Sequence, residues 1–474
     1  VRVPSLRHSR SRTKRMKVLK FGGTSVGTAE SLENVKKIVE SINGEAVVVV
    51  SALGGLTDKL IATARQAAAG DPGYKTEIEG IRRRHHDIIG RVVPVSRRDA
   101  VTAEVDRLLD EMERNYDGVN LLLNLSARTL DVIVSFGERM SSHIVAAMIE
   151  DASRYDSLDF IRTEVWFGRS IADMALTEKG IKDVLGHGGY RYAIVPGFIS
   201  TDRDSGRITN LGRGGSDFTA ALIAAALDAE LLEIWTDVDG FMTADPRVIP
   251  TARVLSHMSF VESMELCSYG AKVIYPPTIY PVFHKNIPIK ILNTFNPTAP
   301  GTLITDRKGD DGRIATGISS VKDTCLIILH GELTTNVAEI NSRTYNALAK
   351  NGVSVLLVSP PAQQEAFSFA VAGADADTAV KVLEEEYAPE LVDGTLSEIH
   401  RQDCLATIAV VGDDLKAYPG LGTRLINTLE RAGIRVHAAS SGVSETTITL
   451  VTGQEDVAEA MRLIHGMLFD NPAE

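Results

Sequence analysis

Apolar and polar positions at the start of the chain predict a parallel β-α-β unit. Lys17 to Lys20 has the pattern of a short strand, and residues 46–50 form a continuous apolar run, typical of a strand buried on both faces. Between them, Thr28 opens an amphipathic helix with apolar residues at helical spacing. A loop rich in glycine follows each strand, at 21–27 and 51–57. Ligands bind at the carboxyl ends of parallel strands, so we expect both loops to contact a ligand.

The same alternation continues to about residue 305 and indicates helices on both faces of one sheet. Residues 58–130 are predicted to form long helices, and the arginine-rich run around His85 and His86 is interpreted as a solvated helix face. The segment Ile133–Met140 is predicted to be strand, turn and helix start, with Glu138 at the turn. Further strands are expected over 192–199, 231–237, 288–292 and 301–305, and a helix over 259–268.

The last third of the chain contains an internal repeat. The segment 348–359 matches 429–440, because each is a helix end, a glycine and an alternating strand. Each copy is preceded by a strand that is expected to start at a cysteine, Cys325 or Cys404, and is followed by a second alternating strand. The pattern is β-α-β-β twice, at a spacing of about 80 residues that suits one small α/β domain each time. Neither copy carries a plausible nucleophile, base or metal cluster, which favours ligand sensing or assembly over catalysis.

A third glycine loop, Thr209–Asp217, is followed by a helical run over 218–227. Its glycines are Gly212, Gly214 and Gly215, so backbone N–H groups can approach a ligand closely. A helix N-terminus attracts anions, and the guanidinium of Arg213 matches a carboxylate or a phosphate. Ser216 and Asp217 are expected at the helix cap. An ordinary glycine turn before a buried helix is the alternative.

Composition narrows the class of protein. The 474 residues are 44% apolar and 24% charged, which suits two to four globular domains. The 50 basic and 62 acidic residues give a net charge of −12. The first fifteen residues hold six basic and no acidic side chains, so the remainder carries 44 − 62 = −18, which argues against nucleic acid as the main partner. We interpret this basic start as a disordered extension before Met16, with a nucleic-acid arm as the alternative.

Three cysteines, far apart in the sequence, suggest neither a disulfide framework nor a zinc site, and they suit a reducing cytosol. No apolar run approaches the length of a membrane span, and the basic start lacks the apolar core of a signal peptide.

The predicted chemistry is phosphoryl transfer. Glycine-bearing loops around residues 22, 54, 137 and 213 are expected to converge, and they bring Lys20, Glu138, Arg213 and Asp217, with Asp237 and Lys272 downstream. The chain has neither a P-loop motif nor a visible Ser/His/Asp or Cys/His set. Lysines and glycine amides stabilise phosphate charge, and a carboxylate acceptor needs no general base because it is already ionised near pH 7. Taken singly, either lysine could instead be a surface cation.

Six motifs, in family order, resemble those of the aspartate kinases. They are Lys20-Phe-Gly-Gly-Thr-Ser-Val26, Phe136-Gly-Glu138, Leu211-Gly-Arg-Gly-Gly-Ser-Asp217, Trp235-Thr-Asp-Val-Asp-Gly240, Asp245-Pro-Arg247 and Gly270-Ala-Lys272. The resemblance runs from Met16 to the C-terminus. It implies a three-layer αβα amino-acid-kinase domain, similar to carbamate kinase, followed by two ferredoxin-like ACT domains. The expected limits are 1–15 for the extension, 16–306 for the catalytic domain, 307–314 for a linker, and 315–395 and 396–474 for the ACT domains, between which strands can be exchanged.

The resemblance implies that ATP phosphorylates the side-chain carboxylate of L-aspartate to 4-phospho-L-aspartate, the first step of lysine, threonine and methionine biosynthesis, in the cytoplasm. It implies catalytic roles for Lys20, which holds the transferring phosphate, and for Asp217, which orients the lysines. The residues implied for aspartate and the phosphate path are Ser51, Thr57, Glu138, Arg213 and Ser216. Those implied for ATP are Lys20, Gly22, Gly23, Thr236, Asp237, Met242, Arg247 and Lys272. Mg²⁺ is expected to be bound largely by the phosphates, with no protein metal site.

The repeats depart from the family pattern. The first copy reads Ser359-Pro-Pro-Ala-Gln-Gln-Glu365, whereas the second keeps Ser440-Ser-Gly-Val-Ser-Glu445. This departure leaves the identity of the effector open. The resemblance implies lysine, threonine or both as candidates, and it implies a homodimer or homotetramer. An end at residue 474 implies that the homoserine dehydrogenase domain of bifunctional relatives is absent. Two alternatives are a kinase of the same fold that acts on glutamate, acetylglutamate or UMP, and a catalytically silent amino-acid sensor.

Overall fold

The computed structural model describes residues 16–166, 169–307, 312–331, 337–359, 366–441 and 446–470. They form two compact units: the first holds residues up to Gly240 and Pro277–Thr305, and the second holds Phe241–Pro276 and residues from Asp306 on. The predicted basic extension, residues 308–311 of the predicted linker and the segments 360–365 and 442–445 lie outside the described residues.

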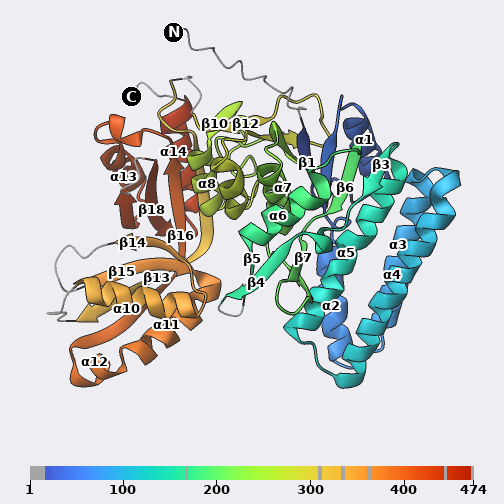
Figure 1. Ribbon diagram of the computed structural model, residues 1–474. Coiled ribbons are helices and arrows are strands. Elements are labelled where there is room, and N and C mark those ends of the chain that lie inside the picture. The colour runs from blue at the N-terminus through green and yellow to red at the C-terminus, as the bar shows by residue number, and fades with distance from the viewer. Residues whose placement is uncertain are drawn as a thin grey trace, which may run out of the picture. The chain divides into compact units, whose positions relative to one another are not determined.

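The first unit is built on a twisted sheet in the order β12-β11-β9-β1-β2-β6-β3. Neighbouring strands are parallel except for β12, which runs antiparallel to β11. The predicted β-α-β unit is confirmed, and its first strand lies in the middle of the sheet (Figure 1). The strands are β1 (Lys17–Phe21), β2 (Ala46–Val50), β3 (Ala152–Arg154), β6 (Tyr192–Pro196), β9 (Leu231–Thr236), β11 (Ile289–Asn293) and β12 (Thr302–Thr305).

Helices cover both faces of this sheet, as the alternation predicts. One core cluster joins Leu19 and Phe21 of β1 to the helices that precede β3. Successive side chains of a strand point to opposite faces, so Val18 and Lys20 face the other layer, where α7 packs on β1, β2 and β9. The helices of the first unit are α1 (Ala29–Glu40), α2 (Leu56–Ala68), α3 (Tyr74–Val92), α4 (Val95–Leu122), α5 (Ala127–Met148), α6 (Met174–Leu185), α7 (Gly215–Ala226) and α9 (Ile279–Phe283).

The strand predicted over 192–199 is wrong in its extent, because β6 ends at Pro196. Gly197 and Phe198 then turn the chain, and Phe198 has a φ of 68°. After this turn, β7 and β8 pair with the earlier strands β4 and β5 in a second sheet, in the order β5-β4-β7-β8. The Arg213 loop follows β8. Its strands are β4 (Arg162–Trp166), β5 (Arg169–Ala172), β7 (Ile199–Asp202) and β8 (Ile208–Asn210).

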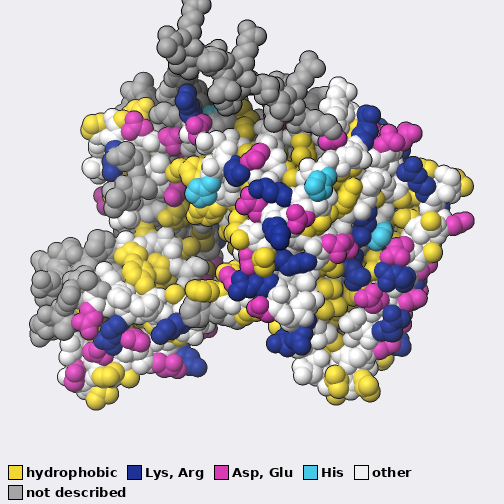
Figure 2. Space-filling view, viewed as in Figure 1, with side chains coloured by type: hydrophobic (Ala, Val, Ile, Leu, Met, Phe, Trp, Pro, Cys, Tyr) yellow, Lys and Arg dark blue, Asp and Glu magenta, His cyan; other side chains and the backbone are white. Residues whose placement is uncertain are grey.

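The helices predicted over 58–130 are confirmed, but the interpretation of His85 as solvated is wrong. His85 is buried in the face of α3 that packs on the core, and burial lowers its pKa to about 4. Arg82 of the same helix instead forms ion pairs with Asp106 and Asp110 of α4. Basic and acidic side chains are accordingly interspersed on the face in view over these helices (Figure 2).

The second unit holds a six-stranded antiparallel sheet in the order β14-β15-β13-β16-β18-β17. The repeat is confirmed, but each copy's first strand is longer than expected. Cys325 and Cys404 lie within long strands, because β13 and β16 each run through both copies, and Asp323 and Cys404 take positive φ where the register shifts. The strands are β13 (Gly317–Gly331), β14 (Val355–Ser359), β15 (Ala366–Ala372), β16 (Leu396–Val411), β17 (Val436–Ser441) and β18 (Thr447–Gly453).

Two separate cores support the two halves of this sheet. The segment Phe241–Pro276 belongs to the second unit and contains α8, the helix expected over 259–268. Ser259 caps this helix and forms a capping box with Glu262. The remaining elements are β10 (His257–Ser259), α8 (Phe260–Ser268), α10 (Val337–Lys350), α11 (Gly373–Glu386), α12 (Ala388–Asp393), α13 (Leu421–Arg431) and α14 (Val457–His465).

Candidate active site

A cleft of about 360 Å³ opens where β1 and β2 end in their glycine loops. Its walls come from segments far apart in the sequence, which the parallel sheet brings together at one edge. The lining residues are Lys20, Gly23, Ser51, Ala52, Leu53, Gly55, Thr57, Asp58, Glu138, Phe198, Gly212, Arg213, Gly214, Gly215, Ser216 and Asp217. The two predicted catalytic residues and all five predicted for aspartate and the phosphate path thus lie together.

Lys20 and Asp217 form an ion pair inside this cleft. The amine Nζ of Lys20 lies 2.5 Å from Oδ1 of Asp217, and their side chains are only 11% and 13% exposed. The strand alternation aims Lys20 at the face covered by α7, whose first turn carries Asp217. Each charge compensates the other where water is scarce. A lysine held in this way is preorganised to stabilise negative charge on a ligand.

The loops after β1 and β2 pack backbone against backbone. A Cβ on Gly54 would lie 3.0 Å from the carbonyl oxygen of Gly23, and a Cβ on Gly23 would lie 3.2 Å from that of Ala52. Glycine is therefore required at the contact between the two loops. Both loops keep their main chain at the edge of the cleft, where N–H groups can approach an anion.

The Arg213 loop turns on two glycines in the left-handed region, Gly212 with φ 71° and Gly214 with φ 68°. Helix α7 begins at Gly215, and Gly214 is its N-cap. Ser216 and Asp217 therefore lie in the first turn, and the prediction that they lie at the cap is wrong. No side chain caps this helix end, which leaves its N–H dipoles directed at the cleft. Among the described residues, Arg213 is exposed and forms no ion pair.

Glu138 lies in the middle of α5, so the prediction of strand, turn and helix start over 133–140 is wrong. The helix is already capped by Ser126, and it runs through Gly137 without a break. Gly137 is needed for a close approach and not for a turn. A Cβ there would lie 2.7 Å from the Cβ of Ala52 in the loop after β2.

The carboxyl group of Glu138 is buried at the wall of the cleft. The residue is 4% exposed, and Oε2 has no hydrogen-bond partner among the described residues. Burial raises the pKa of Glu138 to about 8, against the opposing effects of the Ala52 N–H and the charge of Lys20. A perturbed acid with an unsatisfied oxygen in a cleft is a site that a cationic ligand group would complete.

Ser51 and Thr57 are fixed by the loop and helix that carry them. The backbone N–H of Ser51 donates to the carbonyl of Phe21 at 3.2 Å, and the hydroxyl of Ser141 donates to the carbonyl of Ser51 at 2.7 Å. Thr57 stands in the first turn of α2. Both side chains are half-buried at the wall of the cleft.

The residues predicted to bind ATP fall into three groups: those that line the cleft, those elsewhere in the first unit, and those in the second unit. Gly23 and Lys20 line the cleft, while Gly22, Thr236 and Asp237 lie in the first unit outside its lining. Gly22 donates its N–H to the carbonyl of Trp235 at 3.1 Å, next to Thr236 at the end of β9. The remaining residues predicted for ATP belong to the second unit and their role stays a prediction; they are Met242, Arg247 and Lys272.

Sequence reasoning missed Leu53, Asp58 and Phe198 as lining residues. Leu53 lies within the predicted glycine loop 51–57 and Asp58 directly follows it, so the loop itself was the available signal. Phe198 follows Pro-Gly at the end of β6, and a chain turn after a buried strand could have indicated it.

In the part of the chain that the structure describes, no group of three or more His, Cys, Asp or Glu side chains could hold a metal ion. The described side chains therefore do not supply a full set of magnesium ligands by themselves. None of the described helices is both long and apolar enough to cross a membrane.

Comparisons with known proteins agree with this geometry. The profile of the amino acid kinase family matches residues 15–293, and an ACT domain profile matches residues 408–468. A bifunctional aspartokinase/homoserine dehydrogenase of Haemophilus influenzae is 32% identical over 96% of this chain and 57% of its own length. The chain thus spans about half the length of the bifunctional relatives it matches.

Lysine-sensitive aspartokinase 3 of Escherichia coli is 30% identical over 96% of this chain and 99% of its own length. The crystal structure of E. coli aspartokinase III in complex with aspartate and ADP superposes with a TM-score of 0.83 at 28% identity, covering 96% of this chain and 100% of that one. The chain therefore belongs to the aspartokinase branch of the amino acid kinase family.

Proposed function

We propose that the protein is an aspartate kinase, which transfers the γ-phosphoryl group of ATP to the side-chain carboxylate of L-aspartate. The observation that carries the proposal is the buried Lys20–Asp217 pair, at 2.5 Å, in a cleft walled by three glycine loops. Among the described residues, Arg213 forms no ion pair and Oε2 of Glu138 has no hydrogen-bond partner. Both groups line the same cleft, where they complement an amino acid with a second carboxylate.

In this proposal aspartate is held by opposite charges at its two ends. The guanidinium of Arg213 pairs with a carboxylate, for which its fork of donors is suited. Glu138 ionises when it receives the substrate ammonium, because a neighbouring positive charge favours the carboxylate form and offsets the cost of burial. Ser216, Thr57 and Ser51 contribute hydroxyl donors around the acceptor and the phosphate path.

The transfer needs no general base. One oxygen of the side-chain carboxylate attacks the γ-phosphorus, a new O–P bond forms, and the bond from that phosphorus to the bridging oxygen of ADP breaks. The electron pair of that bond leaves with ADP, and the acceptor becomes an acyl phosphate. No proton moves, because the carboxylate is ionised near pH 7.

Charge stabilisation is then the main task of the protein. Lys20 holds oxygens of the transferring phosphate, and the loop amides near Gly23 bind others. Asp217 orients Lys20 and is not a base, since the acceptor offers no proton to remove. ATP contacts are assigned to Gly22, Gly23, Thr236, Asp237, Met242, Arg247 and Lys272. Mg²⁺ would be bound by the nucleotide phosphates and water, and no step is assigned to it.

We further propose the limits 16–306 for the catalytic domain and 315–395 and 396–474 for two ACT domains with exchanged strands. The long strands β13 and β16, each shared by both halves of the six-stranded sheet, support the exchange. An amino-acid effector at the ACT domains, lysine or threonine or both, and a homodimer or homotetramer complete the proposal. One relative carries the name lysine-sensitive aspartokinase, which supports lysine.

The direct test is ADP formation by the purified chain with ATP, Mg²⁺ and one acceptor at a time: L-aspartate, L-glutamate, N-acetylglutamate or UMP. We expect ADP release that depends on L-aspartate and is absent from the Lys20→Ala variant. Preference for another acceptor would reassign the enzyme within its fold family. No acceptor-dependent ADP with any of them would support a silent sensor. Repeating the assay with lysine, threonine, both or neither identifies the effector.

A further inference from the structure

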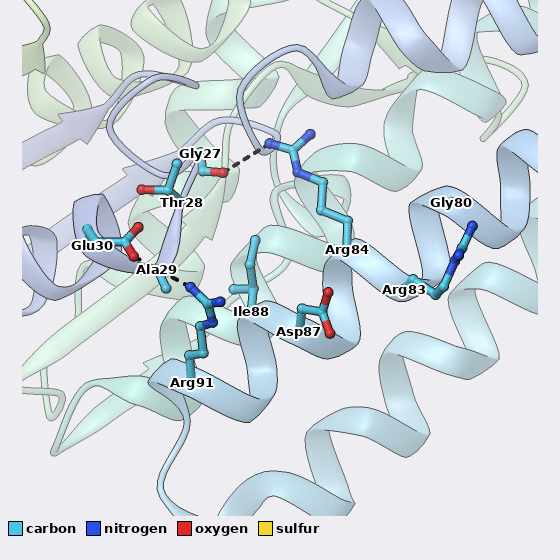
Figure 3. A pocket seen from close by; sticks show the side chains of 10 residues that line it. All are labelled: Gly27, Thr28, Ala29, Glu30, Gly80, Arg83, Arg84, Asp87, Ile88 and Arg91. Atoms are coloured by element: carbon cyan, nitrogen blue, oxygen red, sulfur yellow. Dashed lines mark hydrogen bonds and ion pairs between the residues drawn. The ribbon is translucent and has the colours of Figure 1, made fainter.

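Arg84 joins the loops that follow β1 and β2. Its Nη2 donates to the carbonyl oxygen of Gly27 at 3.0 Å and to that of Gly54 at 2.8 Å. Gly27 ends the loop that begins just after Lys20, and Gly54 lies in the loop that begins at Ser51. Figure 3 shows the guanidinium of Arg84 reaching from α3 to Gly27. One nitrogen therefore ties together the main chains of two loops that wall the cleft.

The two loops depend on each other for their shape. A Cβ on Gly27 would lie 3.2 Å from the carbonyl oxygen of Gly23 and 3.4 Å from the nitrogen of Gly54. The contact is between main chains, and Arg84 donates from outside both loops to one carbonyl of each. A donor from outside that binds both carbonyls sets the spacing between the loops.

Arg84 differs from the arginines near it on α3. Arg82 and Arg91 are engaged by carboxylates, Arg91 by Glu30 at 3.5 Å. Arg83 is exposed and donates to the carbonyl of Glu79 of its own helix. Among the described residues no carboxylate pairs with Arg84, whose side chain is half-buried. The hydrogen bonds that distinguish Arg84 from these arginines are those to the two loop carbonyls.

We propose that Arg84 is a positioning residue for phosphoryl transfer, which fixes the spacing of the loops 21–27 and 51–55. The role rests on the proposed function of those loops. Arg84 does not line the cleft, so it acts through the main chain and not on a ligand. Small misplacements of reacting groups lower turnover strongly, even when the altered residue is remote from the chemistry.

A second pocket makes the proposal testable by chemical rescue. It has a volume of about 550 Å³, and its lining includes Arg84 together with Gly27 and Arg83. No residue lines both this pocket and the cleft. A guanidinium ion can therefore reach the position of a truncated Arg84 through a pocket that shares no lining residue with the cleft.

The experiment compares Arg84→Ala with Arg83→Ala, which removes the same side chain from the same helix without touching a loop carbonyl. We expect Arg84→Ala to lower kcat about tenfold while KM for aspartate stays within about twofold, because the aspartate contacts are left in place. Low-millimolar guanidinium chloride should restore part of kcat in Arg84→Ala but not in Arg83→Ala, against sodium chloride at the same concentration. Amide hydrogen exchange should rise in peptides spanning both loops in Arg84→Ala only.

Equal kcat in the two variants would overturn the positioning role. So would a loss in Arg84→Ala that appears only as a lower fraction of folded enzyme, without rescue by guanidinium. If wild type makes no acceptor-dependent ADP, the proposed function fails, whereas the exchange measurement still decides whether Arg84 holds the loops. Unchanged exchange in both loops would contradict that hold.

Discussion

The amine of Lys20 lies 2.5 Å from the carboxylate of Asp217, although one residue belongs to the first strand and the other to the seventh helix. A nearly buried charge is stable only when it is paired with an opposite charge, so this contact holds the end of β1 next to the first turn of α7 at the cleft. It also holds a cation where a phosphoryl group would receive an incoming carboxylate.

Lys20→Ala and Asp217→Ala should each lower turnover by at least about a hundredfold. The first removes the cation that stabilises the transferring phosphate, and the second removes the carboxylate that orients this cation. Each also leaves a nearly buried partner unpaired, so the melting temperature should fall, while the far-ultraviolet circular dichroism spectrum should remain that of a folded protein. Lys36→Ala, which removes a helix-surface partner of Glu40, is the control and should change neither. Normal rates in either site variant would refute its role.

Arg213→Ala should mainly raise KM for aspartate, by about tenfold or more, because it removes the cation that pairs with a substrate carboxylate. Stability should change little, since Arg213 is exposed and forms no ion pair among the described residues. Arg213→Lys should recover only part of the affinity, because an ammonium lacks the planar fork of a guanidinium. Steady-state kinetics with aspartate varied at saturating ATP measures this, and an unaltered aspartate dependence would count against the pairing.

Glu138 should make stability depend on pH. Its pKa is raised from an ordinary 4.5 to about 8 in the folded protein, so folding favours the protonated form. This contribution to stability is complete below pH 4.5 and is lost as the pH rises through about 8. Glu138→Gln keeps a neutral group of the same shape and does not titrate.

The melting temperature of wild type should therefore fall relative to that of Glu138→Gln as the pH rises from 4.5 to about 8, and the difference should level off above that range. Differential scanning fluorimetry of both proteins across this range measures it. A constant difference in melting temperature would show that Glu138 is ionised in the free enzyme.

Gly137→Ala should lower both stability and turnover, although alanine favours helices. The added methyl group would meet the Cβ of Ala52 at 2.7 Å and displace the loop after β2 or helix α5, which carries Glu138. Gly80→Ala in α3 is the matched control, because a Cβ there has no neighbour within 4 Å. The control should gain about 0.5–1 kcal/mol of stability from helix propensity and keep its activity. Chemical denaturation and initial rates compare the pair, and full activity in Gly137→Ala would contradict the close-packing role.

Much of the central fold could be predicted because its strands are buried on both faces. The run at 46–50 is β2 with its predicted bounds, and Thr28 and Ser31 form the capping box that opens α1. The expected convergence of glycine-bearing loops placed Lys20, Arg213 and Asp217 together, and all three line the cleft. These signals are local in sequence, and the parallel sheet converts them into a shared site.

Other features depend on contacts that are distant in sequence. Gly137 was interpreted as a turn because glycine is common in turns, but here it relieves a contact with Ala52, which no local pattern reveals. His85 lies in a charged run, yet it falls on the buried stripe of α3. The joining of two copies in β13 and β16 is likewise set by strand pairing across the repeat. Arg84 escaped notice because its partners are main-chain carbonyls, which have no sequence signature.

The central claim is that an ionised carboxylate is itself the phosphoryl acceptor, with charge supplied around it by Lys20 and its neighbours. The most direct measurement uses L-aspartate labelled with oxygen-18 in the side-chain carboxylate, with ATP and Mg²⁺, and traps the product with hydroxylamine, which displaces phosphate from the acyl carbon. The account predicts inorganic phosphate that carries oxygen-18 in step with hydroxamate formation, because the bridging oxygen of an acyl phosphate comes from the acceptor. Phosphate free of the label, at an undiminished rate of ADP release, would mean that water is the acceptor and would contradict the account.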